Sequence, residues 1–220
     1  MDNLLKRLID QLDTLIPFLA ISHKDVFKLI QKEKNILLQV SQQSSLPNTY
    51  KIYRSQIAHS SLLLGYSYFG AFLADLVRKI YKSNPQMLPK EKQLKFNEIL
   101  DVKDYNSVLD LMIEKEVIEL FYQRAEKIIE YFEKKLKLTW QKEQKLSFVK
   151  VSCIRNCIIH SMSKADNRLS EVSKYKVGKK IELDSSDVHS FGITAREFAR
   201  NLYGLANKKY FQTKKKPKKK

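Results

Sequence analysis

The sequence has little of what marks a disulfide-rich, repetitive or cofactor-dependent protein. Its 220 residues include two cysteines, five glycines and five prolines. So few glycines and prolines, without a regular repeat of roughly 20–50 residues, argue against a solenoid. The motifs G-x-x-x-x-G-K-S/T, G-x-G-x-x-G and H-E-x-x-H are missing from the sequence. We therefore expect no nucleotide cofactor and no bound metal.

The two cysteines are not placed to form a disulfide. Cys153 and Cys157 are one helical turn apart, so their side chains share a face but lack disulfide geometry. We expect two reduced core residues in a cytoplasmic protein. Cys157 and His160 are spaced like two ligands of one metal ion, but two ligands do not make a zinc site. The N-terminal residues also lack a basic segment followed by a continuous apolar stretch, so we expect no secretion signal.

Long apolar stretches are scarce. The segment Ser55–Ala74 runs twenty residues without a formal charge, but it contains Gln56, His59 and several serines. This is polar for a membrane span. The sequence therefore predicts a buried central helix here and no membrane association.

Acidic residues are outnumbered by basic ones. There are 24 Asp and Glu against 41 Lys and Arg, which gives a formal net charge of +17. Six lysines lie in one terminal run: Lys214, Lys215, Lys216, Lys218, Lys219 and Lys220. Removing their six charges leaves +11, so the remaining chain is basic too. This charge points to a nucleic acid or an anionic membrane surface as partner, and the terminal run is expected to be a flexible arm that contacts nucleic-acid phosphates.

Apolar residues recur at three- and four-residue steps through most of the chain, which predicts an all-α helical bundle with almost no sheet. The expected helices cover residues 4–19, 25–43, 48–82, 89–100, 104–122, 124–138, 143–162 and 186–208. Pro17 is expected to kink or end the first of them. We expect a loop over residues 163–174 and a short extended turn around Gly178. The tail after residue 211 is expected to be disordered.

The helix expected over residues 143–162 carries an Arg and a His in an otherwise apolar pattern. Its segment Arg155-Asn156-Cys157-Ile158-Ile159-His160 reads R-N-x-x-x-H. This resembles the signature of HEPN domains (higher eukaryotes and prokaryotes nucleotide-binding), in which an Arg and a polar residue precede a His. More loosely, residues 68–76 look like the first core helix of that family. The pair of helices over 104–138 resembles an insertion in larger HEPN proteins of restriction and abortive-infection systems.

The resemblance implies a bundle of HEPN type and a metal-independent endoribonuclease that acts on RNA as a toxin or an antiviral or stress effector. It implies a homodimer whose two motifs face one cleft, and it suggests a cognate antitoxin or a defence-system protein as a further partner. Arg155 and His160 would carry the chemistry, with Asn156 in support. Two alternatives stay open. One is a non-catalytic HEPN module that binds nucleic acid or a partner protein as a dimer, and the other is a basic helical scaffold in which the motif is accidental.

The residue types suit RNA cleavage. Histidine transfers protons near neutral pH, and the planar guanidinium of arginine donates charge-assisted hydrogen bonds to phosphate oxygens. On a regular helix, however, Arg155 lies about 140° around from His160. The two groups converge only if the Arg side chain curls over or the helix ends near His160. Asn156 shares a face with His160 and can hold its tautomer or bind phosphate. The alternative is a purely structural role for Arg155, in an ion pair with Asp75 or Glu143.

We expect a helical extension over residues 1–45, a HEPN-like domain over 46–210 with an insertion at 103–138, and a Lys-rich tail over 211–220. Asp75 lies in the most apolar of the expected helices, where a carboxylate needs a partner. Arg78, one turn on, is the expected partner. A supporting role toward Arg155 is the alternative.

Overall fold

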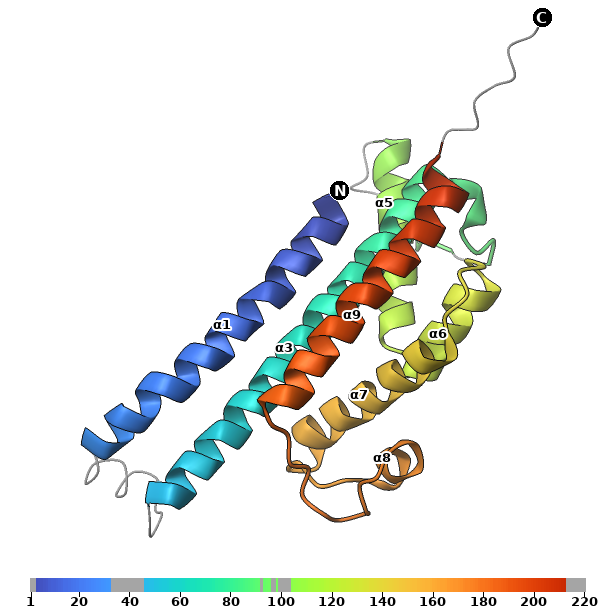
Figure 1. Ribbon diagram of the computed structural model, residues 1–220. Helices are drawn as coiled ribbons and strands as arrows, with labels where there is room; N and C mark the ends of the chain where they lie inside the picture. Colours follow the sequence, from blue (N-terminus) through green and yellow to red (C-terminus); the bar gives the residue numbers. More distant parts are fainter. Residues whose placement is uncertain (1–2, 33–45, 92, 96–97, 99–103, 213–220) are drawn as a thin grey trace, which may run out of the picture. The chain divides into compact units, whose positions relative to one another are not determined.

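The computed structural model describes residues 3–32, 46–91, 93–95, 98 and 104–212, and these residues form an all-α fold (Figure 1). The α-helices are α1 (Asn3–Lys32), α3 (Leu46–Ser83), α5 (Tyr105–Phe121), α6 (Ala125–Lys134), α7 (Lys142–His160), α8 (Asn167–Val172) and α9 (Ser185–Ala206). A 3-10 turn, η1 (Pro85–Met87), follows α3, and a π-helical turn, η2 (Asn207–Phe211), follows α9. The described residues contain no strand. The predicted all-α class is confirmed.

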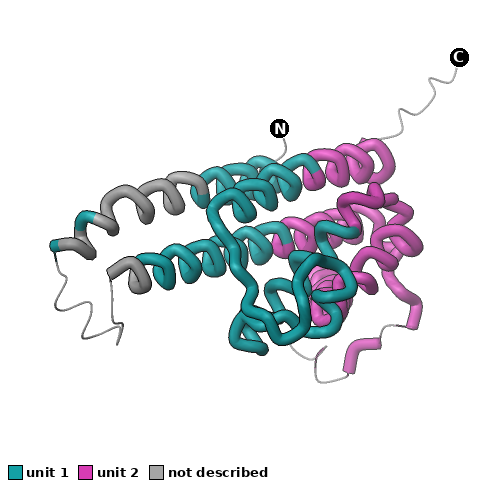
Figure 2. The backbone as a smooth tube through the Cα atoms, turned by 60° about the horizontal axis from the view of Figure 1, so that its bottom comes forward, with its two compact units in different colours: residues 1–69, 146–197 teal, residues 70–145, 198–220 magenta. Residues whose placement is uncertain are grey.

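The chain divides into two compact units (Figure 2). Unit 1 comprises residues 1–69 and 146–197, and unit 2 comprises residues 70–145 and 198–220. Helices α3, α7 and α9 each contribute residues to both units. This division does not test the expected domain ranges 1–45, 46–210 and 211–220, which stay predictions.

Unit 1 contains an apolar stripe on α1. Its buried side chains recur at three- and four-residue steps, as expected for an amphipathic helix, and are Leu5, Leu8, Ile9, Leu12 and Leu15. Gly65 of α3 lies at a close approach of three helices. A Cβ built there would lie 3.1 Å from Cε1 of Phe191 on α9 and 3.2 Å from Cδ1 of Leu15. The absent side chain lets these three helices pack tightly.

Two expected helices, 4–19 and 25–43, are one helix as far as Lys32, so the prediction that the first helix could end at Pro17 is wrong. Proline removes one backbone hydrogen bond, to the carbonyl of Asp13, but its φ suits a helix. The remaining bonds of a 30-residue helix stay in place. Residues 33–45 lie outside the described part of the chain.

Two further expectations about secondary structure are wrong in part. The helix expected over 89–100 does not begin at Pro89, because the described residues of 89–95 are turn and coil, whereas Glu98 is helical. The N–H of Lys95 donates to Oε2 of Glu98 at 2.6 Å and the N–H of Glu98 donates to the carbonyl of Lys95 at 3.0 Å, contacts that are typical of a helix start. The loop expected over 163–174 contains α8, because Asp166 caps that helix by accepting from the N–H of Leu169 at 2.8 Å.

Helix α6 is shorter than the expected helix over 124–138. It ends at Lys134, and Lys137 has a left-handed backbone, with φ of 52°. Leu136 and Leu138, on either side of this residue, are both buried. These two leucines fit the apolar spacing of the helix, so the sequence pattern predicted a helix longer than the one that forms.

Unit 2 has an aromatic core around Trp140. Its ring meets Phe132 edge-on with centroids 5.5 Å apart, and it meets Phe198 of α9 at 4.3 Å. Unit 2 also buries a charged group, Glu116 of α5. Its carboxylate accepts from the hydroxyl of Tyr131 at 2.6 Å and from the ammonium of Lys135 at 3.1 Å. A buried carboxylate needs such partners.

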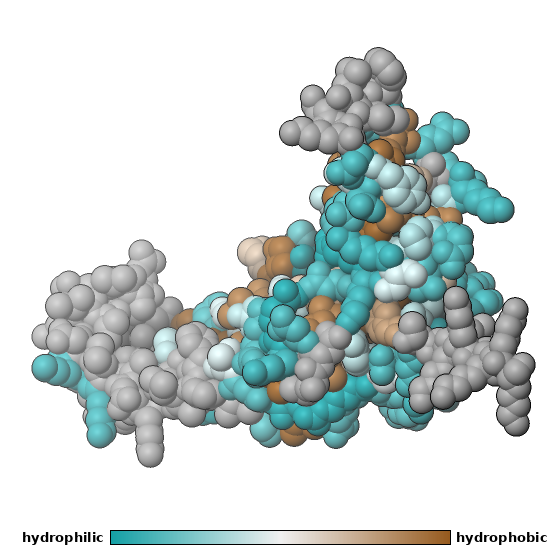
Figure 3. Space-filling model, turned by 90° about the horizontal axis from the view of Figure 1, so that it is seen from above, coloured by the Kyte–Doolittle hydropathy of each residue, from teal (hydrophilic) through white to brown (hydrophobic). Residues whose placement is uncertain are grey.

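The described surface is mostly hydrophilic on the face that Figure 3 shows, with apolar patches between the polar side chains. Several large apolar side chains are exposed. They include Ile118 of α5 and Tyr122 just after it, and Ile159 and Met162 at and just beyond the end of α7.

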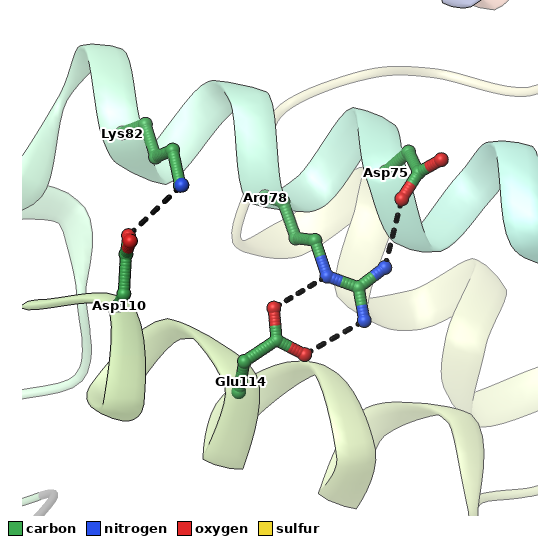
Figure 4. Close-up of polar contacts among 5 residues, drawn as sticks. All are labelled: Asp75, Arg78, Lys82, Asp110 and Glu114. Carbon is green, nitrogen blue, oxygen red and sulfur yellow. Dashed lines mark hydrogen bonds and ion pairs between the residues drawn. The ribbon is translucent and has the colours of Figure 1, made fainter. Parts of the chain in front are cut away.

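Asp75 pairs with Arg78 within unit 2 (Figure 4). The guanidinium donates through Nη1 to Asp75 at 2.9 Å, through Nε to Oε1 of Glu114 at 2.6 Å and through Nη2 to Oε2 of Glu114 at 2.8 Å. The bond from Arg78 holds the pKa of Glu114 below its ordinary value. The expected structural partner of Asp75 is thus confirmed, and this clamp joins α3 to α5.

Candidate functional site

The helix that carries the motif, α7, packs in unit 1 through its apolar side. Its buried residues are Phe148, Val151, Cys153, Ile154 and Cys157. The ring of Phe148 stacks on Tyr66 of α3 with centroids 5.7 Å apart and meets Phe69 of α3 edge-on at 5.9 Å. Contacts of this kind add to the area buried and fix the rotation of the helix. They determine which side of α7 the motif occupies.

Helix α7 ends at the last residue of the motif, His160. The N–H groups of Ser161 and Ser163 both donate to the carbonyl of Cys157 at 3.0 Å, which closes the helix. Met162 and Ser163 have φ of 50° and 60°. Two successive non-glycine residues in the left-handed region are strained, and such strain is concentrated at functional sites. The imidazole of His160 is exposed beside this turn.

Arg155 and Asn156 are bonded to each other. Nη1 of Arg155 donates to Oδ1 of Asn156 at 2.9 Å, and both residues are half-buried. Because Asn156 shares a helix face with His160, this bond draws the guanidinium toward the side that carries the imidazole. Both conditions for convergence are therefore met: the Arg side chain bends toward Asn156, and the helix ends at His160.

Of the two roles that the sequence allows for Asn156, the hydrogen bond to Arg155 favours phosphate binding. Its carbonyl oxygen is occupied by Arg155, so its amide NH₂ is the group left to donate to a phosphate. Within the described residues neither Asp75 nor Glu143 forms an ion pair with Arg155. The structural alternative, a carboxylate partner for Arg155, is therefore not found among the described residues.

His59 of α3 is connected to the motif, although in the sequence it stands alone. It is buried, with Nε2 3.3 Å from the carbonyl of Ile181 and Nδ1 3.4 Å from Oγ of Ser163. A carbonyl only accepts, so Nε2 carries the proton and Nδ1 of the neutral ring accepts from the Ser163 hydroxyl. Burial lowers the pKa of His59, and the charge of Lys180 adds to this. His59 thereby supports the turn that follows His160.

A signal for His59 existed in the sequence, but it was incomplete. A histidine in the apolar segment Ser55–Ala74 needs polar partners once it is buried. Those partners lie 104 and 122 residues away in the chain, and no local spacing identifies them.

The segment after the motif forms a small hydrogen-bonded hairpin. Lys164 and Lys180 form an isolated antiparallel bridge. The N–H of Ile181 donates to the carbonyl of Ser163 at 2.7 Å, and the N–H of Gly178 donates to that of Ala165 at 2.8 Å. The expected turn around Gly178 is present, with φ of 76° at this glycine.

Both cysteines are buried, as expected for core residues. Burial raises the pKa of the Cys157 thiol, which favours the neutral form. The described residues hold no group of three or more His, Cys, Asp or Glu side chains suited to a metal ion.

Helix α3 over Tyr50–Ser83 has the length and composition of a membrane span, with a mean hydropathy of 1.3 in its most apolar window. Half of that window is buried inside the protein. The core helix of a soluble protein passes the same test. The expectation of no membrane association stays a prediction. The terminal lysines from Lys214 to Lys220 lie outside the described residues.

Comparison with models of protein families, with curated proteins and with solved structures yields no match to this chain. The HEPN resemblance therefore depends on the R-N-x-x-x-H motif and the helical segments around it.

Proposed function

We propose that this chain is a metal-independent endoribonuclease of HEPN type that acts on RNA as a toxin or an antiviral or stress effector. The observation that carries the proposal is the arrangement at the end of α7. The half-buried guanidinium of Arg155 is held by the amide of Asn156, on the helix face that leads to the exposed imidazole of His160. A cation oriented by a neutral amide keeps its charge available for a phosphate.

The chemistry needs two proton transfers and one charge stabilisation. In the first transfer, neutral His160 accepts the proton of the RNA 2′-hydroxyl as its oxygen attacks phosphorus. Arg155 donates hydrogen bonds to the non-bridging oxygens, where negative charge accumulates in the transition state. The bond from phosphorus to the 5′-oxygen then breaks, and that oxygen takes a proton from a second acid.

A homodimer supplies this second acid. Each motif contains one histidine, whereas the reaction uses a base and an acid. Two copies facing one cleft provide His160 from one protomer as base and the same residue of the other protomer, in its protonated form, as acid. A dimer thus doubles the motif without a metal ion. A cognate antitoxin or a defence-system protein would act by blocking or opening this cleft.

A second candidate function is a non-catalytic HEPN module that binds nucleic acid or a partner protein as a dimer. Two exposed apolar side chains on either side of His160 favour it: Ile159 is 47% and Met162 is 82% exposed. Contiguous exposed apolar patches mark protein-binding faces, and in this candidate the two side chains belong to such a patch.

RNA cleavage in excess EDTA tests the first candidate. Wild-type protein should cut single-stranded RNA and spare DNA, which lacks the 2′-hydroxyl. His160→Ala and Arg155→Ala should each lower the rate by about 10² or more, since each removes a proton-transfer or charge-stabilising group. The matched controls His189→Ala and Arg200→Ala replace exposed residues of α9 and should keep the wild-type rate. Loss of cleavage in EDTA with recovery in magnesium would contradict the proposal, and absence of all cleavage would favour the binding module.

Mixing wild-type and His160→Ala chains tests the shared site. A heterodimer of the two retains one His160, whereas the reaction uses one histidine as base and a second as acid. Cleavage should therefore fall more steeply than the wild-type fraction of the mixture, and a fall in simple proportion to that fraction would show that each chain acts alone. A protein that is monomeric in solution would rule out this arrangement.

A further inference from the structure

Unit 1 contains a cleft of about 890 Å³ at the start of α3. One wall is the first part of that helix, and the other is the segment that leads into α9. The cleft is large enough for an extended ligand, since binding sites for small molecules usually span roughly 300–1,000 Å³. Its charged lining residues are Lys51, Arg54, Lys174, Lys180, Glu182, Asp184 and Asp187.

The carboxylates of this cleft are largely engaged. Asp184 accepts from the N–H and the hydroxyl of Ser186 at 2.7 and 2.6 Å, and Asp187 accepts from the N–H of Asp184 at 3.1 Å. These bonds cap α9. Glu182 lies 3.8 Å from Lys51, with about three quarters of each side chain exposed, so their attraction is weak.

The cations are less engaged. Within the described residues, Arg54, Lys174 and Lys180 form no ion pair, although Arg54 lowers the pKa of Asp184 through its charge. The four basic side chains come from both walls, so an anionic chain lying along the cleft meets positive charge on each side. A groove of this kind follows the backbone of a single nucleic-acid strand.

An aromatic ring lies among these charges. The guanidinium of Arg54 is 5.9 Å from the ring centroid of Tyr50, and both residues line the cleft. Proteins bind single-stranded nucleic acid by combining phosphate-binding cations with aromatic or guanidinium planes on which bases stack.

One wall of the cleft is hydrogen-bonded to the turn after His160. Lys180 pairs with Lys164, four residues beyond His160. Four residues span at most about 15 Å, and paired residues of an antiparallel bridge are about 5 Å apart. The Cα atom of Lys180 therefore lies within about 20 Å of that of His160. At about 3.4 Å per nucleotide, one strand of some six nucleotides covers this distance.

We propose that this cleft binds the phosphodiester backbone of single-stranded RNA a few nucleotides away from the phosphate held at Arg155 and His160. The inference rests on the proposed ribonuclease function. Arg54 and Lys180 contact phosphates from opposite walls, and Tyr50 stacks on a base.

Binding of a labelled 12-nucleotide RNA to the full chain, followed by fluorescence anisotropy, tests the cleft. The RNA is 2′-O-methylated, which blocks the attacking hydroxyl and prevents cleavage. The paired change Arg54→Ala with Lys180→Ala should weaken binding about tenfold and lower the slope of log K against log salt by about 1.4, for two lost phosphate contacts. The matched pair Arg200→Ala with Lys208→Ala removes the same exposed side-chain types outside the cleft. It should change binding less than twofold.

If the cleft variant and the control variant weaken RNA binding equally, the inference is overturned, because the attraction for RNA is then spread over the whole basic surface. Displacement of the RNA by poly-glutamate at equal charge concentration would also overturn it, because the cleft would then take acidic peptide as readily. A second double variant, Lys51→Ala with Lys174→Ala, changes one residue on each of the same two walls. It should weaken RNA binding as much as Arg54→Ala with Lys180→Ala does.

A cleavage assay separates failure of the cleft from failure of the ribonuclease proposal. A ribodinucleotide is too short to reach the cleft, so the Arg54→Ala, Lys180→Ala double variant should cleave it at the wild-type rate. For the unmodified 12-nucleotide RNA, the same variant should show a higher KM and an unchanged kcat. An equal loss on both substrates would place Arg54 or Lys180 at the reacting phosphate and overturn the inference. If wild-type protein cleaves neither substrate, the ribonuclease proposal fails, while the anisotropy result still decides the cleft.

Discussion

The imidazole of His59 and the hydroxyl of Ser163 lie 3.4 Å apart, Nδ1 to Oγ, although 104 residues separate them in the chain. The same ring bonds through Nε2 to the carbonyl of Ile181. One neutral histidine of α3 thus contacts both sides of the hairpin that follows His160. Because Ser163 itself has a left-handed backbone, this contact helps to hold a conformation that serine rarely adopts alone.

Stability should fall as pH drops below about 6.5 because of His59. Its pKa is lower in the folded protein than the ordinary value of 6.5, so the unfolded chain binds the proton first as pH falls. The contribution is complete above about pH 6.5 and is lost as pH falls through the folded pKa. Carboxylates with lowered pKa, such as Asp184 and Glu114, lose their contributions only near pH 4 and below.

Urea denaturation at several pH values measures this effect. In the His59→Gln variant the decline below about pH 6.5 should be smaller than in the wild type. The exposed His189→Gln change is the control and should leave the decline in place. A decline of the same size in His59→Gln would show that other groups are responsible.

Asn156 should affect catalysis through Arg155. Asn156→Ala removes the bond that orients the guanidinium, and we expect cleavage to fall about tenfold. Asn156→Asp should lower it further, because a charge-assisted pair with Arg155 neutralises the cation that a phosphate would use. The measurement is kcat on RNA, with circular dichroism to verify the helical content. An Asp variant more active than the Ala variant would contradict an orienting role for a neutral amide.

The clamp of Arg78 should stabilise the fold without affecting RNA cleavage. Arg78→Ala should lower the free energy of unfolding by about 1 kcal/mol, since the paired groups are partly exposed and screened by water. Arg78→Lys should cost nearly as much, because an ammonium cannot reproduce the two-pronged contact with Glu114.

Lys82→Ala is the matched control for the clamp. Lys82 pairs with Asp110 at 3.0 Å on the same two helices, but both side chains are more than half exposed. Its loss should be smaller than that of Arg78→Ala in urea denaturation. Equal losses would indicate that the geometry of the Arg78 clamp adds nothing.

Deleting residues 213–220 should weaken RNA binding and flatten its dependence on salt. The deletion removes six lysines, and each phosphate contact to a single strand contributes about 0.7 to the slope. We expect a decrease of up to about four in the slope, with the helical content by circular dichroism unchanged. An unaltered slope would show that these lysines do not contact RNA.

Local patterns in the sequence were sufficient for most of the helices and for the motif. Apolar spacing predicted α3, α5, α7 and α9 to within a few residues. Such features depend on interactions within one or two turns, which sequence spacing records. The order Arg155, Asn156, His160 is equally local, and it limited the helix geometry before any packing was known.

Other features were decided by tertiary structure. The residues near Pro17 do not indicate that α1 continues through it. Helix α8 lies in a polar segment, and it is stabilised by the burial of one residue, Leu169, against the rest of the protein. The bond between His59 and Ser163 and the cleft between Lys51 and Lys180 join residues more than a hundred positions apart. Which helices pack together determines such contacts, and a spacing rule of three or four residues carries no information about them.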